Sequence, residues 1–243
     1  MTERQTQLLQ AIINEFIENS EAVGSVHLVE KYHLPISSAT IRNEMTELMK
    51  LGYIAKTHLS SGRVPTTLAY KRFVEQIYED EPEIKVSLAS KIRQELYANR
   101  FDIDELLLSA LKILFKQSGS VGFALLGKRI YHYGLSRIPT LPEYKQVEGL
   151  CNLIYIMEDN LLLNEILDGS EETGETGETR VIFGEDLELD VFKQMVIIYC
   201  PLMLYESKKV CIGVIGSKRI DYNNIIPLVN LITKTVSESI VGW

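Results

Sequence analysis

The stretch PISSATIRNEMTELMKLGY, residues 35–53, combines the periodicity of a helix with an unusual polar side. Its apolar residues recur at spacings of four and three, so they share one face that is predicted to be buried; they are Ile41, Met45, Leu48 and Leu51. Proline at position 35 disfavours helix in the residue before it. The helix is therefore predicted to begin at Ser37 or Ser38 and to end at Gly52.

The segments before and after this helix are predicted to be further helices and a strand, in an order that is known from other proteins. Helices are predicted at 3–19, 26–33 and 67–78, a loop at 19–25, and a strand at 53–58 with a polar tip at 59–66. Thr2 and Gln5 form a capping box at the first helix, and Ser25 is expected to cap the second. Helices followed by a strand, a tip and a further helix are typical of a winged helix-turn-helix. Residues 1–80 are predicted to be a DNA-binding domain of this kind.

The polar side of the central helix has the residue types of a DNA-recognition helix. With the apolar face inward, the opposite side consists of Ser38, Ala39, Arg42, Asn43 and Thr46. The helix N-terminus and its hydroxyls favour phosphate groups. Arg can donate two hydrogen bonds to guanine, and Asn can pair in the same way with adenine. A solvated face of an ordinary amphipathic helix is the competing interpretation.

The polar tip after the strand is a candidate for a second contact with DNA. It places His58, Ser60, Ser61 and Arg63 around Gly62, which permits an unusual backbone angle. Small hydroxyls and one arginine suit contact with phosphates or insertion into the minor groove. A polar hairpin without a ligand is the alternative for the tip taken alone.

The distribution of charge favours a nucleic-acid partner although the net charge does not. The chain has 243 residues and a formal net charge of −8. Residues 34–74 nevertheless contain six Lys or Arg and two Glu, a local balance of +4, whereas residues 158–190 contain twelve acidic residues and one Arg. Local charge matters more for binding than the total does. Double-stranded DNA is therefore the predicted partner of the N-terminal region.

The pattern of predicted elements changes after the acidic segment EDEPE at 79–83. Two amphipathic helices are assigned to a helical linker at 81–118. Short β-branched and aromatic runs then predict strands at 121–126, 129–134, 180–184, 196–204 and 209–216. Helices are predicted at 142–167 and after Asp221. Residues 119–243 are expected to form a mixed α/β domain with an acidic, mobile loop at 168–179.

A membrane protein is not predicted. The longest apolar run, residues 195–205, is too short to span a bilayer, and the first residues lack a basic-then-apolar signal. A cytoplasmic protein is expected. The three cysteines, Cys151, Cys200 and Cys211, are expected to be free thiols that serve as small buried residues.

An enzyme is not predicted either. The segment GFALLGKR, residues 122–129, lacks the hydroxyl residue of a P-loop and is assigned to a strand and a turn. The histidines and carboxylates show no metal-site or triad pattern. No catalytic residue, metal or cofactor is therefore predicted, and a nucleotide hydrolase is the remotest alternative.

Several of these motifs occur together in a known family. The segments MTERQTQLLQAIINEFIENSEAVGS, SSATIRNEM, LGYI and SSGRVPT resemble the N-terminal domain of the HrcA heat-inducible transcription repressors. The C-terminal segment CIGVIGSKRIDYNNIIPLV and the central segment HYGLSRIPTLPEYKQVEGLCNLI are similar to further parts of the same family. The similarity covers most of the chain.

The resemblance implies an α+β protein in which a winged-helix domain is joined to a GAF-like domain. It also implies a homodimer that binds an inverted-repeat operator and represses chaperone genes, with the GroE chaperonin as a further partner. Carried over by position, the DNA-facing residues are Ser38, Thr40, Arg42, Asn43, Ser60, Ser61, Gly62 and Arg63. Thr46 and His58 are added to this set from their positions on the helix and the tip.

Two departures from the family bear on these expectations. Members usually have a dimerisation insert within the GAF-like domain, whereas here residues 121–136 pass almost directly from one half to the other. The C-terminal segment has GSKRIDY where the family tends to have a Pro-Thr pair before the Arg. The leading hypothesis is a dimeric DNA-binding repressor. The alternatives are a ligand-sensing regulator of the GAF type and a protein-interaction module that has lost dimerisation.

Overall fold

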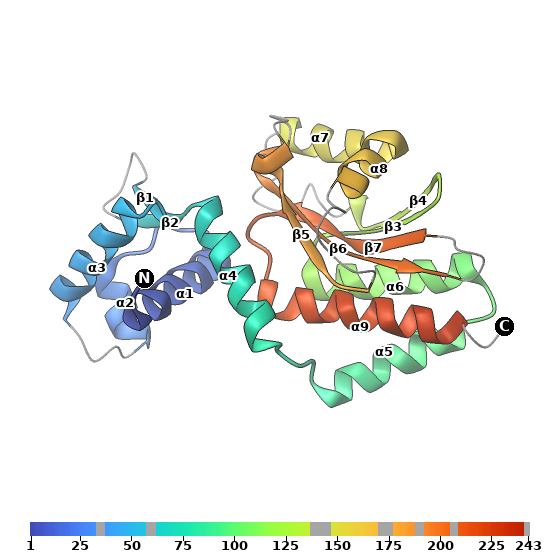
Figure 1. The fold of residues 1–243 in the computed structure, drawn as a ribbon, viewed down its shortest axis with the longest axis horizontal. Helices are drawn as coiled ribbons and strands as arrows, with labels where there is room; N and C mark the ends of the chain where they lie inside the picture. The colour runs from blue at the N-terminus through green and yellow to red at the C-terminus, as the bar shows by residue number, and fades with distance from the viewer. Residues whose placement is uncertain are drawn as a thin grey trace. The chain divides into compact units, whose positions relative to one another are not determined.

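A computed structural model describes residues 1–32, 37–56, 62–136, 147–169, 177–187, 192–204 and 209–240. The chain divides into two compact units, Met1–Glu81 and Pro82–Trp243. Helices and antiparallel strands occur in both units, as Figure 1 shows. The mixed α+β class predicted from the sequence is correct.

The first unit combines helices with a short β-hairpin. Its elements are α1 (Glu3–Asn19), α2 (Ser25–Tyr32), α3 (Ser38–Lys50), β1 (Ile54–Lys56), β2 (Arg63–Pro65) and α4 (Thr67–Asp80). The two strands are antiparallel, with Ala55 opposite Val64. The core of the unit is formed by buried apolar side chains from every helix, among them Ile12, Ile13, Leu28, Ile41, Leu48 and Phe73. The capping box predicted at Thr2 and Gln5 is present.

Three local details of this unit differ from the sequence-based expectation. The predicted loop at 19–25 contains a β-bridge, in which Val23 donates its N–H to the Arg63 carbonyl at 2.8 Å and accepts the Arg63 N–H at 3.0 Å. Ser25 is the first residue of α2 and does not precede it as a cap. Leu51, predicted to be buried, is 49% exposed because it follows the last turn of α3 as the C-cap.

The second unit is built on a five-stranded antiparallel sheet with the strand order β4-β3-β7-β6-β5. Its helices are α5 (Val86–Ala98), α6 (Ile103–Ser118), α7 (Val147–Glu158), α8 (Asn160–Gly169) and α9 (Tyr222–Ile240). Its strands are β3 (Val121–Leu126), β4 (Arg129–Tyr133), β5 (Arg180–Phe183), β6 (Met195–Met203) and β7 (Lys209–Ser217). In Figure 1, α5, α6 and α9 lie on one side of the sheet and α7 and α8 on the other. All five predicted strands are present.

Two helical predictions for this unit are corrected. Helices α5 and α6 do not form a linker, because α5 packs against α9 and α6 packs against β3 and α9. The predicted helix at 142–167 is interrupted at Asp159, whose carboxylate accepts the N–H groups of Leu161 at 3.1 Å and Leu162 at 3.0 Å. This contact caps the N-terminus of α8. Residues 142–146 lie outside the described residues.

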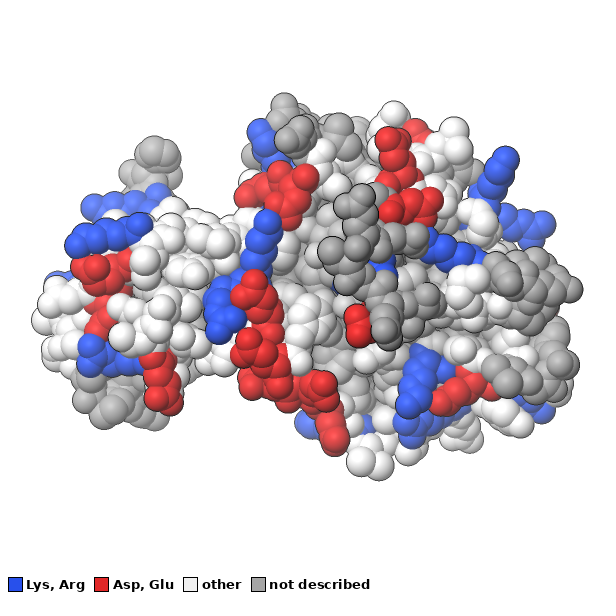
Figure 2. Space-filling view, in the orientation of Figure 1, with Lys and Arg blue, Asp and Glu red and all other residues white. Residues whose placement is uncertain are grey.

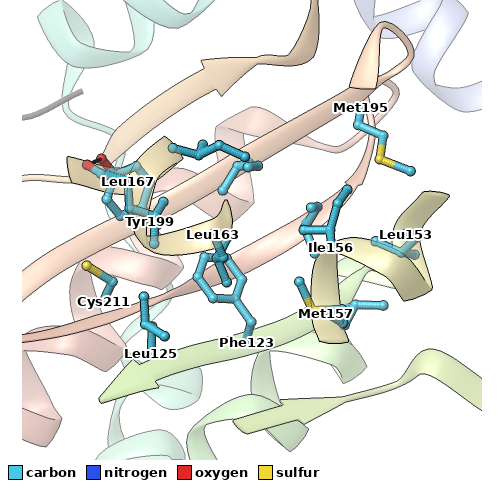
Figure 3. Close-up of a cluster of buried hydrophobic side chains, with 14 of the residues drawn as sticks. Phe123, Leu125, Leu153, Ile156, Met157, Leu163, Leu167, Met195, Tyr199 and Cys211 are labelled. Carbon is cyan, nitrogen blue, oxygen red and sulfur yellow. Dashed lines mark hydrogen bonds between the residues drawn. The ribbon is translucent and has the colours of Figure 1, made fainter. Parts of the chain in front are cut away.

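The sheet separates two apolar layers, so its central strands β3, β6 and β7 are buried on both faces, whereas the edge strand β4 is partly exposed. Figure 3 shows the layer on the α7 and α8 side, where Phe123 and Leu125 of β3 meet residues of both helices and of β6. Gly122, the residue before Phe123, faces α6 so closely that an added Cβ would lie 2.8 Å from the Leu111 carbonyl oxygen. Burial on both faces explains why the sequences of these three central strands are nearly continuous apolar runs without alternation.

The segment with the partial P-loop pattern is a tight hairpin. Leu126 of β3 pairs with Arg129 of β4 across a two-residue turn. The turn begins with Gly127 at φ 59°, a conformation that glycine adopts without steric cost. The prediction of a strand and a turn is confirmed.

The cysteines are free thiols, but they do not share one environment. Cys200 and Cys211 are buried, and burial raises the pKa of each thiol to about 11. Cys151 is exposed on α7, so the expectation that all three are buried is wrong for this residue. The predicted acidic loop at 168–179 falls largely outside the described residues.

Candidate nucleic-acid interface

The candidate recognition residues of α3 lie on the side opposite its buried face. Ile41, Met45 and Leu48 are buried in the first unit. Arg42 and Asn43 are exposed, and Thr46 is exposed one turn after Arg42. Ser38 and Thr40 are half-buried in the first turn of the helix.

The N-terminus of α3 is closed by a serine cap. Ser37 accepts the backbone N–H of Thr40 at 3.2 Å, and the two side-chain oxygens of these residues lie 3.0 Å apart. The positive end of the helix dipole therefore lies beside Ser38 and Thr40, where negative charge is favoured. Thr46 donates its hydroxyl to the Arg42 carbonyl at 2.9 Å, which leaves its oxygen only as an acceptor for a ligand.

Both acidic residues of α3 are balanced by neighbouring cations. Glu44 is buried, forms an ion pair with Arg4 of α1, and accepts the side-chain N–H of Gln5 at 3.0 Å. Glu47 is exposed and pairs with Lys50 at 2.7 Å. Figure 2 shows basic side chains interspersed with acidic ones over the visible face of the first unit. The coloured side chains on this face of the first unit therefore do not form a continuous basic patch.

Arg42 is connected to α2 by a hydrogen bond that the sequence did not predict. Its Nε donates to the hydroxyl of Ser25 at 3.1 Å. Ser25 was expected to cap α2, and a contact between residues of two different helices leaves no periodic signal in the sequence. The only feature of the sequence that indicates such a hydrogen bond is a hydroxyl residue, Ser25, at the start of α2.

The structure corrects the role of Gly62 at the predicted tip. Gly62 is buried, and an added Cβ would lie 2.6 Å from the Ala22 carbonyl oxygen. Its φ is not in the left-handed region, so this glycine is needed for the close approach of two backbones and not for an unusual angle. His58, Ser60 and Ser61 lie outside the described residues.

Arg63 lies at the start of β2, at the base of the tip. Its backbone pairs with Val23, its side chain is half-buried, and its Nη1 donates to the carbonyl of Gly62 at 3.3 Å. The structure therefore brings Ser38, Thr40, Arg42, Asn43 and Thr46 together on α3 and holds Arg63 separately in the hairpin.

A buried carboxylate in the same unit connects α1 to α2. The Glu15 side chain is 4% exposed, and its oxygens contact Nε2 of His27 at 2.6 Å and Nζ of Lys31 at 2.7 Å. Burial alone would raise the pKa of Glu15, but the hydrogen bonds from Lys31 and His27 outweigh it and lower that pKa below its ordinary value of 4.5. The same contact with Glu15 raises the pKa of Lys31.

Glu15→Gln is expected to destabilise the first unit by about 1–2 kcal/mol at neutral pH, because a charge-assisted contact is lost. Since the folded-state pKa of Glu15 is lowered, the contribution of its charge is complete above pH 4.5 and is lost as pH falls through the folded-state pKa. Denaturation of both proteins between pH 3 and 7 measures the difference.

Glu18→Gln is the matched control for this prediction. Glu18 contacts the same Lys31 at 2.5 Å, but its side chain is 60% exposed. Its loss is expected to change stability by at most about 0.5 kcal/mol, because exposed ion pairs contribute little. Equal effects of the two substitutions would contradict the assigned role of Glu15.

Other classes of site are not found in the part of the chain that the structure describes. No cluster of three or more His, Cys, Asp or Glu there is arranged to hold a metal ion. No helix in the same residues is both long enough and apolar enough to cross a membrane.

Comparison with known proteins identifies related chains. The heat-inducible transcription repressor HrcA of Clostridium acetobutylicum is 35% identical over 170 residues, which cover 69% of this chain and 48% of that repressor. The protein of the same name from Staphylococcus aureus strain JH9 is 38% identical over 107 residues, 44% of this chain and 33% of that one. The alignments thus span about half and about a third of these relatives' lengths.

Two further comparisons concern the fold of the whole chain and the family of its C-terminal part. The crystal structure of a hypothetical protein at 2.2 Å resolution shares its fold with a TM-score of 0.81 and 17% sequence identity, covering 100% of this chain and 99% of that one. A family model described as "HrcA protein C terminal domain" matches residues 68–226, which is more than half of the chain. The chain therefore belongs to the HrcA family.

Proposed function

We propose that this chain is a sequence-specific DNA-binding repressor of heat-shock genes that binds an inverted-repeat operator as a homodimer. The observation that supports the proposal best is the exposure of Arg42 and Asn43 side by side on α3, a helix whose opposite face is buried. The membership of the chain in the HrcA family gives the reason to connect this surface with transcription.

In the proposed complex, α3 enters the major groove of the operator. Arg42 donates to guanine and Asn43 pairs with adenine, while Ser38 and Thr40 contact phosphates beside the helix N-terminus. The order of α2, α3, β1 and β2 supports a winged helix-turn-helix, whose tip would contact the DNA backbone or the minor groove. The antiparallel sheet with helices on both faces supports a GAF-like assignment for the second unit.

Pairing of two chains is part of the proposal because one winged helix makes few base contacts. Two such units on a symmetric operator supply both affinity and register. The homodimer and the GroE chaperonin as a partner rest on the family resemblance, and the cytoplasmic location rests on the sequence pattern. All three stay predictions.

Selection of bound sequences from a random duplex pool tests the proposed function with the full chain. The expected result is enrichment of an inverted repeat whose two halves are bound cooperatively. A pool without a preferred sequence would contradict a specific DNA-binding function. Enrichment of a single half-site, together with a monomer in sedimentation, would contradict the dimeric mode.

Arg63→Ala is expected to weaken binding to selected and unrelated duplexes alike, because Arg63 is proposed to contact a phosphate. Loss of one phosphate contact reduces the slope of log K against log salt by about 0.9. Fluorescence anisotropy between 50 and 200 mM salt measures this slope. Arg93→Ala, which removes an exposed arginine of α5, is the control and should leave the slope unchanged. An unaltered slope for Arg63→Ala would refute the phosphate contact.

A further inference from the structure

Arg42 extends from α3 with one guanidinium nitrogen already hydrogen-bonded to α2. The Nε–H group donates to the Ser25 hydroxyl at 3.1 Å. A guanidinium has five N–H donors in a planar fork, so four remain on Nη1 and Nη2. Two parallel donors at the end of the fork are what a bidentate contact with guanine O6 and N7 requires.

We infer that Ser25 is a positioning residue that sets the orientation of the Arg42 guanidinium for base recognition. The inference rests on the proposed function and adds a determinant of sequence specificity that does not itself contact DNA. By accepting the Nε–H bond, Ser25 fixes the plane of the guanidinium before DNA binds. An arginine that is already ordered loses less rotamer freedom on binding, which improves affinity for the base that matches its orientation.

The surroundings of Ser25 hold its hydroxyl in a defined position. Ser25 is 7% exposed and begins α2, two residues after Val23, whose backbone is paired with Arg63 of β2. On the other side, α3 is held by Glu44, which contacts Arg4 and Gln5 of α1. The acceptor and the helix that carries Arg42 are therefore each anchored by separate polar contacts. The arginine side chain between them is the part that Ser25 orders.

A double-mutant cycle on DNA binding tests this inference with the full chain. The probe is the labelled duplex recovered from the random pool, with substituted versions of it and an unrelated duplex for comparison. Ser25→Ala is expected to lower affinity for the selected duplex about three- to tenfold and to leave the unrelated duplex unaffected. In an Arg42→Ala background the same change should have no further effect. Ser25→Thr keeps the hydroxyl and should restore binding, and Ser90→Ala on α5 is the control.

A measurement on the free protein distinguishes loss of the hydrogen bond between Ser25 and Arg42 from a general loss of folding. In the free protein, the Arg42 Nε–Hε resonance, identified by its absence in Arg42→Lys, should exchange slowly with water and should exchange faster after Ser25→Ala. Unchanged exchange would overturn the inference, and so would equal losses on both duplexes or effects that add to those of Arg42→Ala. If wild type selects a sequence and Ser25→Ala binds it equally well, only this inference fails. A wild-type chain that selects no sequence would refute the proposed function and this inference with it.

Discussion

Phe123→Ala is expected to lower the free energy of unfolding of the second unit by about 3–5 kcal/mol, the range measured for large-to-small changes of buried aromatic residues. Phe123 is fully buried in β3, where it packs in the layer that contains Ile156 of α7 and Leu163 of α8 (Figure 3). Truncation would leave a cavity between the sheet and two helices that meet the rest of the unit chiefly through this layer. Chemical denaturation followed by circular dichroism measures the loss, and hydrogen exchange assigns it to the second unit.

Phe101→Ala provides the matched control for this experiment. Phe101 is 69% exposed, and the Arg100 guanidinium lies 3.9 Å from its ring centroid. Its removal should cost at most about 1 kcal/mol, as for an exposed cation–π pair. Comparable losses for the two phenylalanines would show that the layer around Phe123 is not the core of the unit.

Elements with a strong local pattern could be predicted from the sequence. The five strands of the second unit are short β-branched and aromatic runs bounded by Gly, Pro or charged residues, and α9 repeats its buried positions at helical spacing. In the candidate site, the same reasoning placed Arg42 and Asn43 on the exposed side of α3, because burial of Ile41, Met45 and Leu48 determines which side remains. These predictions depend only on residues within a single element.

Contacts between distant segments could not be predicted in this way. The role of Gly62 depends on Ala22, which is distant in the sequence but adjacent in the fold, and the orientation of Arg42 depends on Ser25. The interruption at Asp159 has a local cause, since an Asp two and three residues before the N–H groups that it accepts is a helix-capping pattern. That signal was hidden because apolar residues continue on both sides of it.

Arg42→Ala is expected to reduce affinity for the selected duplex by about 1–3 kcal/mol and to relax the preference at one base pair in each half-site. The side chain is exposed, lies next to Asn43, and is held by Ser25 at its Nε atom. Competition binding with duplexes substituted at each position measures both effects. Retention of the full preference at every position would remove Arg42 from the recognition surface.

Arg42→Lys separates the charge of this residue from its geometry. Lysine keeps the positive charge but lacks the planar fork and the Nε donor to Ser25, so it cannot reproduce a bidentate contact with guanine. The expected result is therefore a loss of base preference close to that of Arg42→Ala, with binding to unrelated duplexes and the salt slope near wild type. Arg63→Ala should show the opposite combination, a reduced salt slope with unchanged base preference. If Arg42→Lys instead behaved like wild type on substituted duplexes, Arg42 would act only as a charge, and direct base recognition would have to come from Asn43 or from the tip.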